Sequence, residues 1–75
     1  MFENLKSFIT NYVEVNEDDI TLESRFIDDL GFNSYDFMSL LGDIETEFDI
    51  MIDESEVLNL HTVGDAVKYI ESLKD

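Results

Sequence analysis

The chain has 75 residues, 44% of them hydrophobic, with no cysteine and no proline, and 19 Asp and Glu against four Lys and Arg give a formal net charge of −15. This length predicts one domain over residues 1–75, and the lack of cysteine excludes disulfides and thiolate metal sites. The charge argues against nucleic-acid binding and favours basic protein partners, and without a secretory signal or an apolar run near 20 residues we expect a cytoplasmic protein with no membrane span.

The composition, with three glycines, predicts a mainly helical chain. A first helix is expected from Phe2 to Val13, with one apolar stripe formed by Phe2, Leu5, Ile9, Tyr12 and Val13. A long connection follows, from about Glu14 to Asn33, and Gly31 permits a turn near its end. We expect this connection to be ordered, because several apolar side chains can pin it across the helix ends: Ile20, Leu22, Phe26, Ile27 and Leu30.

Three further helices follow, which makes the predicted fold class all-α. The second is expected from Ser34 to Phe48, with apolar positions at Phe37, Met38, Leu40, Leu41, Ile44 and Phe48. The third is short; Asp53 and Glu56 resemble a capping box, and Val57, Leu58 and Leu60 supply its apolar side. The fourth begins after Thr62, which pairs with Asp65 in a similar cap, and its stripe is Val63, Ala66, Val67, Ile70 and Leu73.

The most informative position is Ser34, at the head of the second helix. Asn33 is a strong N-cap candidate, with Asp36 three residues later in the place of a capping partner. Ser34 then occupies the first helical position with its hydroxyl facing solvent. A phosphodiester on that hydroxyl would lie beside unpaired N–H groups and the positive end of the helix dipole. The alternative is that Ser34 is itself the cap and has no further role.

The wider pattern resembles the acyl carrier protein family. The resemblance rests on the motif Asp29-Leu30-Gly31-x-Asn33-Ser34-x-Asp36 and on the later segments Ile44-Glu45-Thr46-Glu47-Phe48 and Thr62-Val63-Gly64-Asp65. It implies a four-helix bundle of three longer helices and one short helix. It also implies that a phosphopantetheinyl transferase moves 4'-phosphopantetheine from coenzyme A onto Ser34. The terminal thiol of that arm holds an acyl group as a thioester, which fits a chain without cysteine.

The resemblance further implies partners with basic docking surfaces, namely the transferase and acyl-processing enzymes. The residues expected to recognise them are Asn33, Tyr35, Asp36, Asp43, Glu45 and Glu47. Asn33 stands where the family usually has Asp, and Tyr35 where Leu is common, so partner choice is expected to differ from that of a standard fatty-acid carrier. We expect a monomer, and the positions of Met1 and Asp75 favour a free-standing protein.

Several functions remain open within and outside this family. The cargo is expected to be acyl intermediates of fatty-acid or related biosynthesis; the alternative is a specialised stand-alone polyketide, aminoacyl or D-alanyl carrier. An acidic interaction module that mimics nucleic acid and has no cofactor is an alternative of another class. We expect no enzyme activity, because the one histidine, His61, is interpreted as a surface residue without a strained nucleophile turn nearby. The acids lack EF-hand spacing, so no metal site is expected.

Gly42 lies inside the second predicted helix, where glycine costs about 1 kcal/mol relative to alanine. One interpretation is a tolerated surface glycine. The other hypothesis is that Gly42 permits the close approach of a partner or of the arm.

Overall fold

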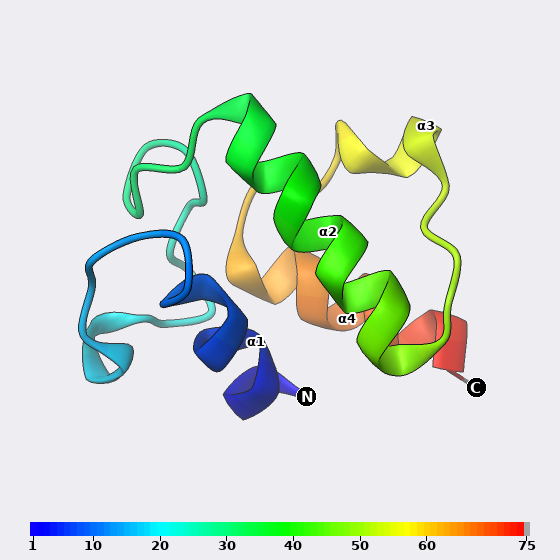
Figure 1. Cartoon of the computed structure of the whole chain (residues 1–75), viewed down its shortest axis with the longest axis horizontal. Coiled ribbons are helices and arrows are strands. Elements are labelled where there is room, and N and C mark those ends of the chain that lie inside the picture. Colours follow the sequence, from blue (N-terminus) through cyan, green and yellow to red (C-terminus); the bar gives the residue numbers. More distant parts are fainter. Residues whose placement is uncertain (75) are drawn as a thin grey trace.

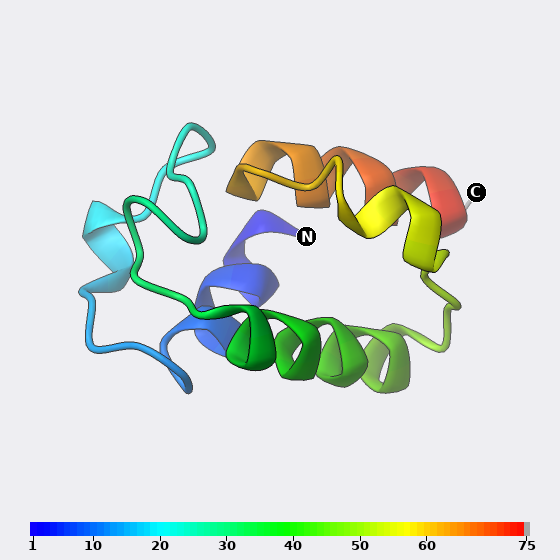
Figure 2. The ribbon, with the colours of Figure 1, turned by 90° about the horizontal axis from the view of Figure 1, so that it is seen from above.

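The fold is all-α, as the sequence predicts. The computed structural model describes residues 1–74, and over this range it contains α1 (Phe2–Ile9), the 3-10 helix η1 (Glu17–Asp19), α2 (Ser34–Phe48), α3 (Glu54–Val57) and α4 (Val63–Lys74). α1 packs against both α2 and α4. Figures 1 and 2 show α1 between those two helices, with α3 on the other side of the pair. No helix within residues 1–74 is long and apolar enough to cross a membrane.

The core joins the helices to the connection before α2. Its largest fully buried side chains are Leu5, Ile9, Phe26, Leu40, Ile44, Val63 and Ile70. At the head of α2, the ring of Phe26 lies 4.9 Å from that of Phe37 and 5.8 Å from that of Phe32. Burying a side chain of this size contributes about 2 kcal/mol. This aromatic cluster therefore fastens the connection to the first turn of α2.

α1 ends at Ile9, four residues before the predicted end at Val13. Beyond it, the N–H groups of Asn11 and Tyr12 donate to carbonyls three residues back, at 3.1 and 3.0 Å, which is the pattern of a tighter turn. Thr10, Asn11, Tyr12 and Val13 all have weak helix propensities, so the helix is not continued. The predicted apolar stripe is nevertheless kept, because Tyr12 and Val13 still pack against the core.

Some apolar residues predicted to face the core are exposed instead. Met38 is 49% exposed, Leu58 79% and Leu73 38%, and in the connection before α2 Leu22 and Ile27 are about half exposed. Helical spacing gives the direction of a side chain, but it does not show whether a neighbouring element covers that side. Met38 points to the side where the single turn of α3 lies, and α3 is too short to cover it.

The connection before α2 is ordered, as predicted, and it is tied to the start of α4. Three backbone hydrogen bonds of 2.8 to 3.1 Å join residues 22–26 to residues 61–64. Ile20, Phe26 and Leu30 anchor the connection in the core. Gly64 allows the closest contact, because a Cβ atom there would lie 2.9 Å from the carbonyl oxygen of Leu22. A side chain at position 64 would therefore push the two segments apart.

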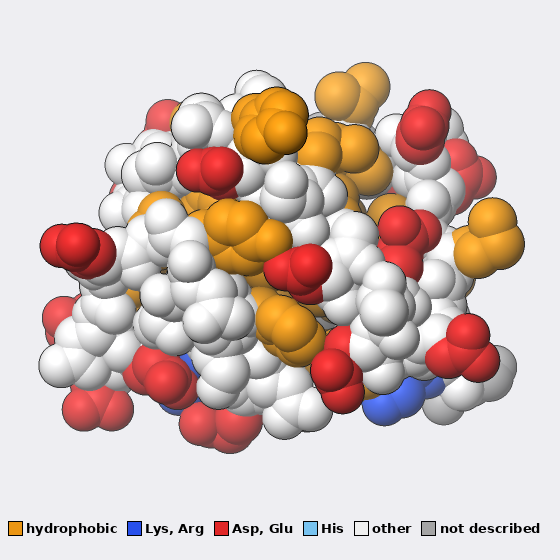
Figure 3. Space-filling view, in the orientation of Figure 1, with side chains coloured by type: hydrophobic (Ala, Val, Ile, Leu, Met, Phe, Trp, Pro, Cys, Tyr) orange, Lys and Arg blue, Asp and Glu red, His pale blue; other side chains and the backbone are white. Residues whose placement is uncertain are grey.

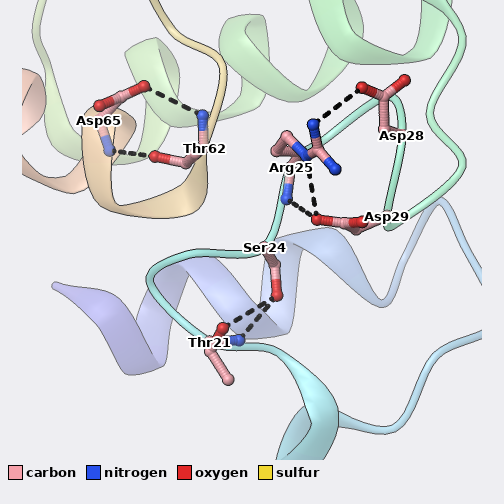
Figure 4. A network of polar contacts seen from close by, with 7 residues as sticks. All are labelled: Thr21, Ser24, Arg25, Asp28, Asp29, Thr62 and Asp65. Atoms are coloured by element: carbon pink, nitrogen blue, oxygen red, sulfur yellow. Dashed lines mark hydrogen bonds and ion pairs between the residues drawn. The ribbon is translucent and has the colours of Figure 1, made fainter.

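Side-chain contacts within the same connection support its turns (Figure 4). The Ser24 hydroxyl accepts a hydrogen bond from the N–H of Thr21 at 2.9 Å. The N–H of Arg25 donates to Asp29 Oδ2 at 2.8 Å, and the Arg25 guanidinium forms ion pairs with Asp28 and Asp29 at 3.5 and 3.4 Å. The bond from the Arg25 N–H is the main reason why the pKa of Asp29 lies below its ordinary value. These contacts close the turn that leads to Gly31.

The cap predicted at the start of α4 is present and reciprocal. The N–H of Asp65 donates to Thr62 Oγ1 at 3.0 Å, and Asp65 Oδ2 accepts from the N–H of Thr62 at 3.1 Å (Figure 4). The same oxygen accepts from the N–H of His61 at 3.2 Å. Burial raises the pKa of Asp65, but these donors outweigh it and hold the pKa below its ordinary value. At α3, Asp53 accepts from the N–H of Ser55 at 2.9 Å rather than pairing reciprocally with the glutamate three positions later.

Candidate functional site

The head of α2 places a serine hydroxyl in solvent. Asn33 is the N-cap: its backbone is extended, and its Oδ1 atom accepts a hydrogen bond from the N–H of Asp36 at 2.7 Å. Ser34 is the first residue of α2 and is exposed. Because Asn33 performs the capping, the alternative in which Ser34 serves as the cap is excluded. The hydroxyl of Ser34 is free for other chemistry.

Two backbone N–H groups at this helix start lack an acceptor. In an α-helix the first N–H groups have no partner inside the helix. Here the N–H of Asp36 is taken by the Asn33 side chain and that of Phe37 by the Asn33 carbonyl at 3.0 Å. Within residues 1–74, the N–H groups of Ser34 and Tyr35 have no acceptor. Donors of this kind, at the positive end of a helix dipole, suit the negative oxygens of a phosphodiester.

The turn before Ser34 is fixed by backbone bonds on both sides of a glycine. Gly31 has a φ of 81°, in the left-handed region that glycine adopts without strain. The N–H of Leu30 donates to the Arg25 carbonyl at 3.0 Å, and the N–H of Phe32 donates to the Phe26 carbonyl at 2.9 Å. Leu30 and Phe32 are both buried. Ser34 therefore follows a segment held by core packing and hydrogen bonds.

The acidic residues predicted for partner recognition lie on different sides of α2. At about 100° per residue, Asp36, Asp43 and Glu47 fall on one side, whereas Glu45 lies almost opposite to them. Tyr35 projects between these sides and is 81% exposed. Figure 3 shows red acidic side chains spread over the face that α2 presents, with apolar side chains between them and blue basic side chains near the lower edge. The negative field thus covers this face without forming one stripe.

Asp43 contacts the turn that follows α1. The Tyr12 hydroxyl, in the turn after α1, donates a short hydrogen bond to the Asp43 carboxylate. This bond is the main cause that raises the pKa of Tyr12 to about 12, with smaller effects from burial and from the charge of Asp43. The Tyr12 ring also lies 5.9 Å from the ring of Phe32. Tyr12 therefore connects α2 with the segment that leads to Ser34.

Glu45 also has an internal contact. Its Oε2 atom accepts a hydrogen bond from the N–H of Ile52, in the segment between α2 and α3, at 2.8 Å. The Glu45 carboxylate therefore helps to hold the segment of residues 49–53 against α2.

A hollow of about 340 Å³ lies between α2, the segment of residues 49–53 and α3. It is lined by Met38, Leu41, Gly42, Glu45, Met51, Ile52, Glu54 and Val57. Its volume is at the lower end of the range for ligand pockets, which starts at about 300 Å³. Its lining is mainly apolar, and two acidic residues are part of it.

The sequence alone did not reveal the hydrogen bonds between residues far apart in the chain. Tyr12 was predicted only as part of an apolar stripe, and no local signal pairs it with Asp43. His61 is exposed, in agreement with its interpretation as a surface residue. Within residues 1–74, no group of three or more His, Asp and Glu residues is arranged to hold a metal ion.

Comparison with known proteins first defines the class. A family model described as "Phosphopantetheine attachment site" matches residues 4–70. The acyl carrier protein of Clostridium perfringens (strain SM101 / Type A) is 46% identical over 70 residues, covering 93% of this chain and 92% of that protein. The acyl carrier protein of Thermotoga maritima is 41% identical over 71 residues, covering 95% and 88%.

A solved structure agrees with these matches. The acyl carrier protein from Enterococcus faecalis, described for its high thermal stability, superposes with a TM-score of 0.84 at 29% identity, covering 96% of this chain and 91% of that one. The chain therefore belongs to the acyl carrier protein family. It is a phosphopantetheine-bearing carrier of acyl groups that works with acyl-processing enzymes and is not itself an enzyme.

Proposed function

We propose that Ser34 is the residue that holds 4'-phosphopantetheine, through its hydroxyl. The observation that carries this proposal is the division of roles at the helix head: Asn33 makes the cap, and Ser34 is left exposed beside two free N–H groups. These groups would lie next to the phosphodiester and favour its charge. When bound, the arm supplies the thiol that carries the acyl group, a sulfur that this cysteine-free chain does not provide.

The partners that we propose are a phosphopantetheinyl transferase and acyl-processing enzymes with basic docking surfaces. A net charge of −15 favours such surfaces at long range. At short range, Glu47 is exposed, Asp36 is half-buried, and Tyr35 offers an exposed ring beside Ser34. Asp43 and Glu45 remain candidates, but a partner would compete there with Tyr12 and with the N–H of Ile52.

The pathway that we propose is fatty-acid or related biosynthesis, with a monomeric carrier in the cytoplasm. The support for this pathway is the strong acidity of the chain and the likeness over most of its length to proteins named acyl carrier protein.

The attachment site is tested by intact mass spectrometry after incubation with coenzyme A, magnesium and a broad-specificity transferase. We expect the wild type to gain one phosphopantetheine and Ser34→Ala to gain none. Ser55→Ala is the matched control, because Ser55 is an exposed serine in the first turn of α3, and this variant should be modified like the wild type. Circular dichroism establishes that all three proteins are folded. A gain by Ser34→Ala, or no gain by the folded wild type with several transferases, would refute the assignment.

A further inference from the structure

A groove lies beyond the end of α2 that is farther from Ser34. It is formed by the segment after α2, by α3 and by the last turns of α4, and its lining residues are Met51, Ile52, Asp53, Glu56, Tyr69 and Leu73. At a rise of about 1.5 Å per residue, Ser34 and Phe48 lie about 21 Å apart along α2. Figures 1 and 2 place the ends of α2 and α4 on the same side of the molecule, away from the start of α2. The groove is therefore separate from the site at Ser34.

The apolar side chains of this groove are left uncovered by the fold. Met51 is 86% exposed, the largest fraction among the exposed large apolar side chains of residues 1–74. Leu73 is 38% exposed and follows Tyr69 by four positions, so both project from the same side of α4. Methionine adapts to irregular apolar surfaces and is common where proteins bind helices. Exposed apolar side chains with polar residues at their rim mark sites of interaction.

The groove has a fixed wall and room for several side chains. The N–H of Asp53 donates to the Tyr69 hydroxyl at 3.0 Å, which holds the segment after α2 against α4. An engineered cavity of about 150 Å³ holds one benzene ring. In proportion, the groove of about 580 Å³ has room for three or four side chains of that size. An amphipathic helix presents about this number of apolar anchors over two turns, at positions i, i+3 or i+4, and i+7.

The charge of the groove selects among possible occupants. Asp53 and Glu56 line it and are exposed, and within residues 1–74 no Lys or Arg lines it. The nearby Lys74 ammonium lies over the Phe48 ring, 5.0 Å from its centroid. A second copy of this chain would bring the same acids and another net charge of −15, and an anionic lipid surface would be repelled in the same way. The complementary surface is one that carries Lys and Arg.

We propose that this groove docks a basic amphipathic helix of another protein. Apolar side chains of that helix would pack between Met51 and Leu73, and its Lys or Arg side chains would lie beside Asp53 and Glu56. Docking at this end leaves Ser34 uncovered, so the carrier can stay attached to one partner while a second acts at Ser34. The docking itself requires no modified serine, whereas its use in holding a loaded carrier rests on the proposed attachment at Ser34.

The test measures binding by fluorescence anisotropy with a labelled synthetic peptide of about four helical turns, with leucines on one face and lysines on the other. A scrambled peptide of the same composition is the control for charge alone. We expect the wild type to bind the amphipathic peptide more tightly than the scrambled one by about tenfold or more. Met51→Ser and Leu73→Ser should each weaken binding by about tenfold, because each removes one apolar contact.

Leu22→Ser is the matched control, since Leu22 is 47% exposed and lies outside the groove lining. It should bind the peptide within about twofold of the wild type. Equal binding of the two peptides, unchanged binding in both groove variants, or an equal loss in Leu22→Ser would overturn the proposal. Binding to phosphatidylglycerol vesicles, or a dimer in sedimentation, would also overturn it if Leu73→Ser abolished either. Circular dichroism establishes that each variant is folded.

A second measurement tests the independence of the two ends of α2. Intact mass follows the modification of Ser34 by coenzyme A and a transferase with and without saturating peptide, and we expect rates within about twofold. A block by the peptide would show that the docked helix covers Ser34 and would overturn the proposed separation. If no modification occurs even without the peptide, the attachment at Ser34 fails, whereas the docking result, obtained with unmodified protein, stands.

Discussion

The two segments that flank α2 are held in different ways. The connection before it, residues 10–33, bonds to the start of α4 through backbone groups and buries Ile20, Phe26, Leu30 and Phe32 in the core. The segment after it, residues 49–53, has backbone bonds only to the adjoining ends of α2 and α3, such as that from the N–H of Ile50 to the Glu45 carbonyl, and no fully buried residue. It is otherwise held by side-chain contacts, from the N–H of Ile52 to Glu45 and from that of Asp53 to the Tyr69 hydroxyl. In that segment Met51 is 86% exposed.

This difference assigns separate tasks to the two ends of α2. The proposed attachment residue, Ser34, follows the segment with buried anchors, so the base of the arm has a fixed position and direction. The hollow is bounded by the segment with few buried contacts, and such segments open at low free-energy cost. The end of α2 that carries Ser34 is therefore the rigid side, and the opposite end is the adaptable side. The following substitutions test this contrast in order of expected effect.

The largest expected effect is that of Gly64→Ala. The new Cβ would lie 2.9 Å from the Leu22 carbonyl oxygen, a backbone atom that cannot turn away. We expect a loss of about 1 to 3 kcal/mol of unfolding free energy, because the bonds between the connection and α4 must lengthen. In a domain of this size each kcal/mol lowers the melting temperature by about 4 to 8 °C. Thermal unfolding followed by circular dichroism measures the shift.

Gly42→Ala is the matched glycine substitution inside α2. No atom lies within 4 Å of its new Cβ, so the gain in helix propensity is not opposed. We expect it to raise the unfolding free energy by up to about 1 kcal/mol, the opposite sign to Gly64→Ala. Shifts of the same sign and size in the two variants would contradict the difference in space around the two glycines.

A smaller effect is expected from Asp65→Asn, which weakens the cap of α4. The folded-state pKa of Asp65 is lowered, so its contribution is present above the ordinary value of 3.8 and is lost as the pH falls through the folded-state pKa. We expect the wild type to be more stable than the variant by about 1 kcal/mol at neutral pH. The difference should shrink as the pH falls below 3.8 and through the folded-state pKa, as urea unfolding over a series of pH values would show.

Asp53→Asn provides the comparison on the adaptable side. The pKa of Asp53 is also lowered, mainly by the N–H of Ser55, but the helix that it caps is the four-residue α3. Since α3 contributes no fully buried residue, its loosening should leave global unfolding almost unchanged. A loss as large as that of Asp65→Asn would mean that the segment after α2 is as strongly anchored as the one before it.

The parts of the fold that were predictable are those encoded locally. The caps at Asn33 and at Thr62 with Asp65 follow from residue types three positions apart, and the turn at Gly31 follows from a glycine before a helix start. The helical stripes located the core because buried positions recur with the helical period. The end of α1 was misplaced, since its apolar stripe continues into a turn that packs on the same core.

The parts that were not predictable depend on contacts between distant positions. Tyr12 and Asp43 are 31 residues apart, and Glu45 and Ile52 are seven apart across the end of a helix. No spacing rule pairs them, so the sequence assigned both acids to partner recognition only. The exposure of Met38 likewise depends on how little of α2 the short α3 covers, which is a property of the assembled fold.

A further effect is expected from Tyr12→Phe, which removes the contact between the turn after α1 and Asp43. The pKa of Tyr12 is raised to about 12, so the hydrogen bond contributes fully below pH 10 and is lost as the pH rises through about 12. We expect a loss of about 1 kcal/mol at neutral pH. An ultraviolet titration should show that the last tyrosine to ionise disappears in Tyr12→Phe but persists in Tyr35→Phe, whose ring is 81% exposed. Persistence of that last step in Tyr12→Phe would show that Asp43 is free for partners, and the side of α2 that faces Tyr12 would then belong to the docking surface.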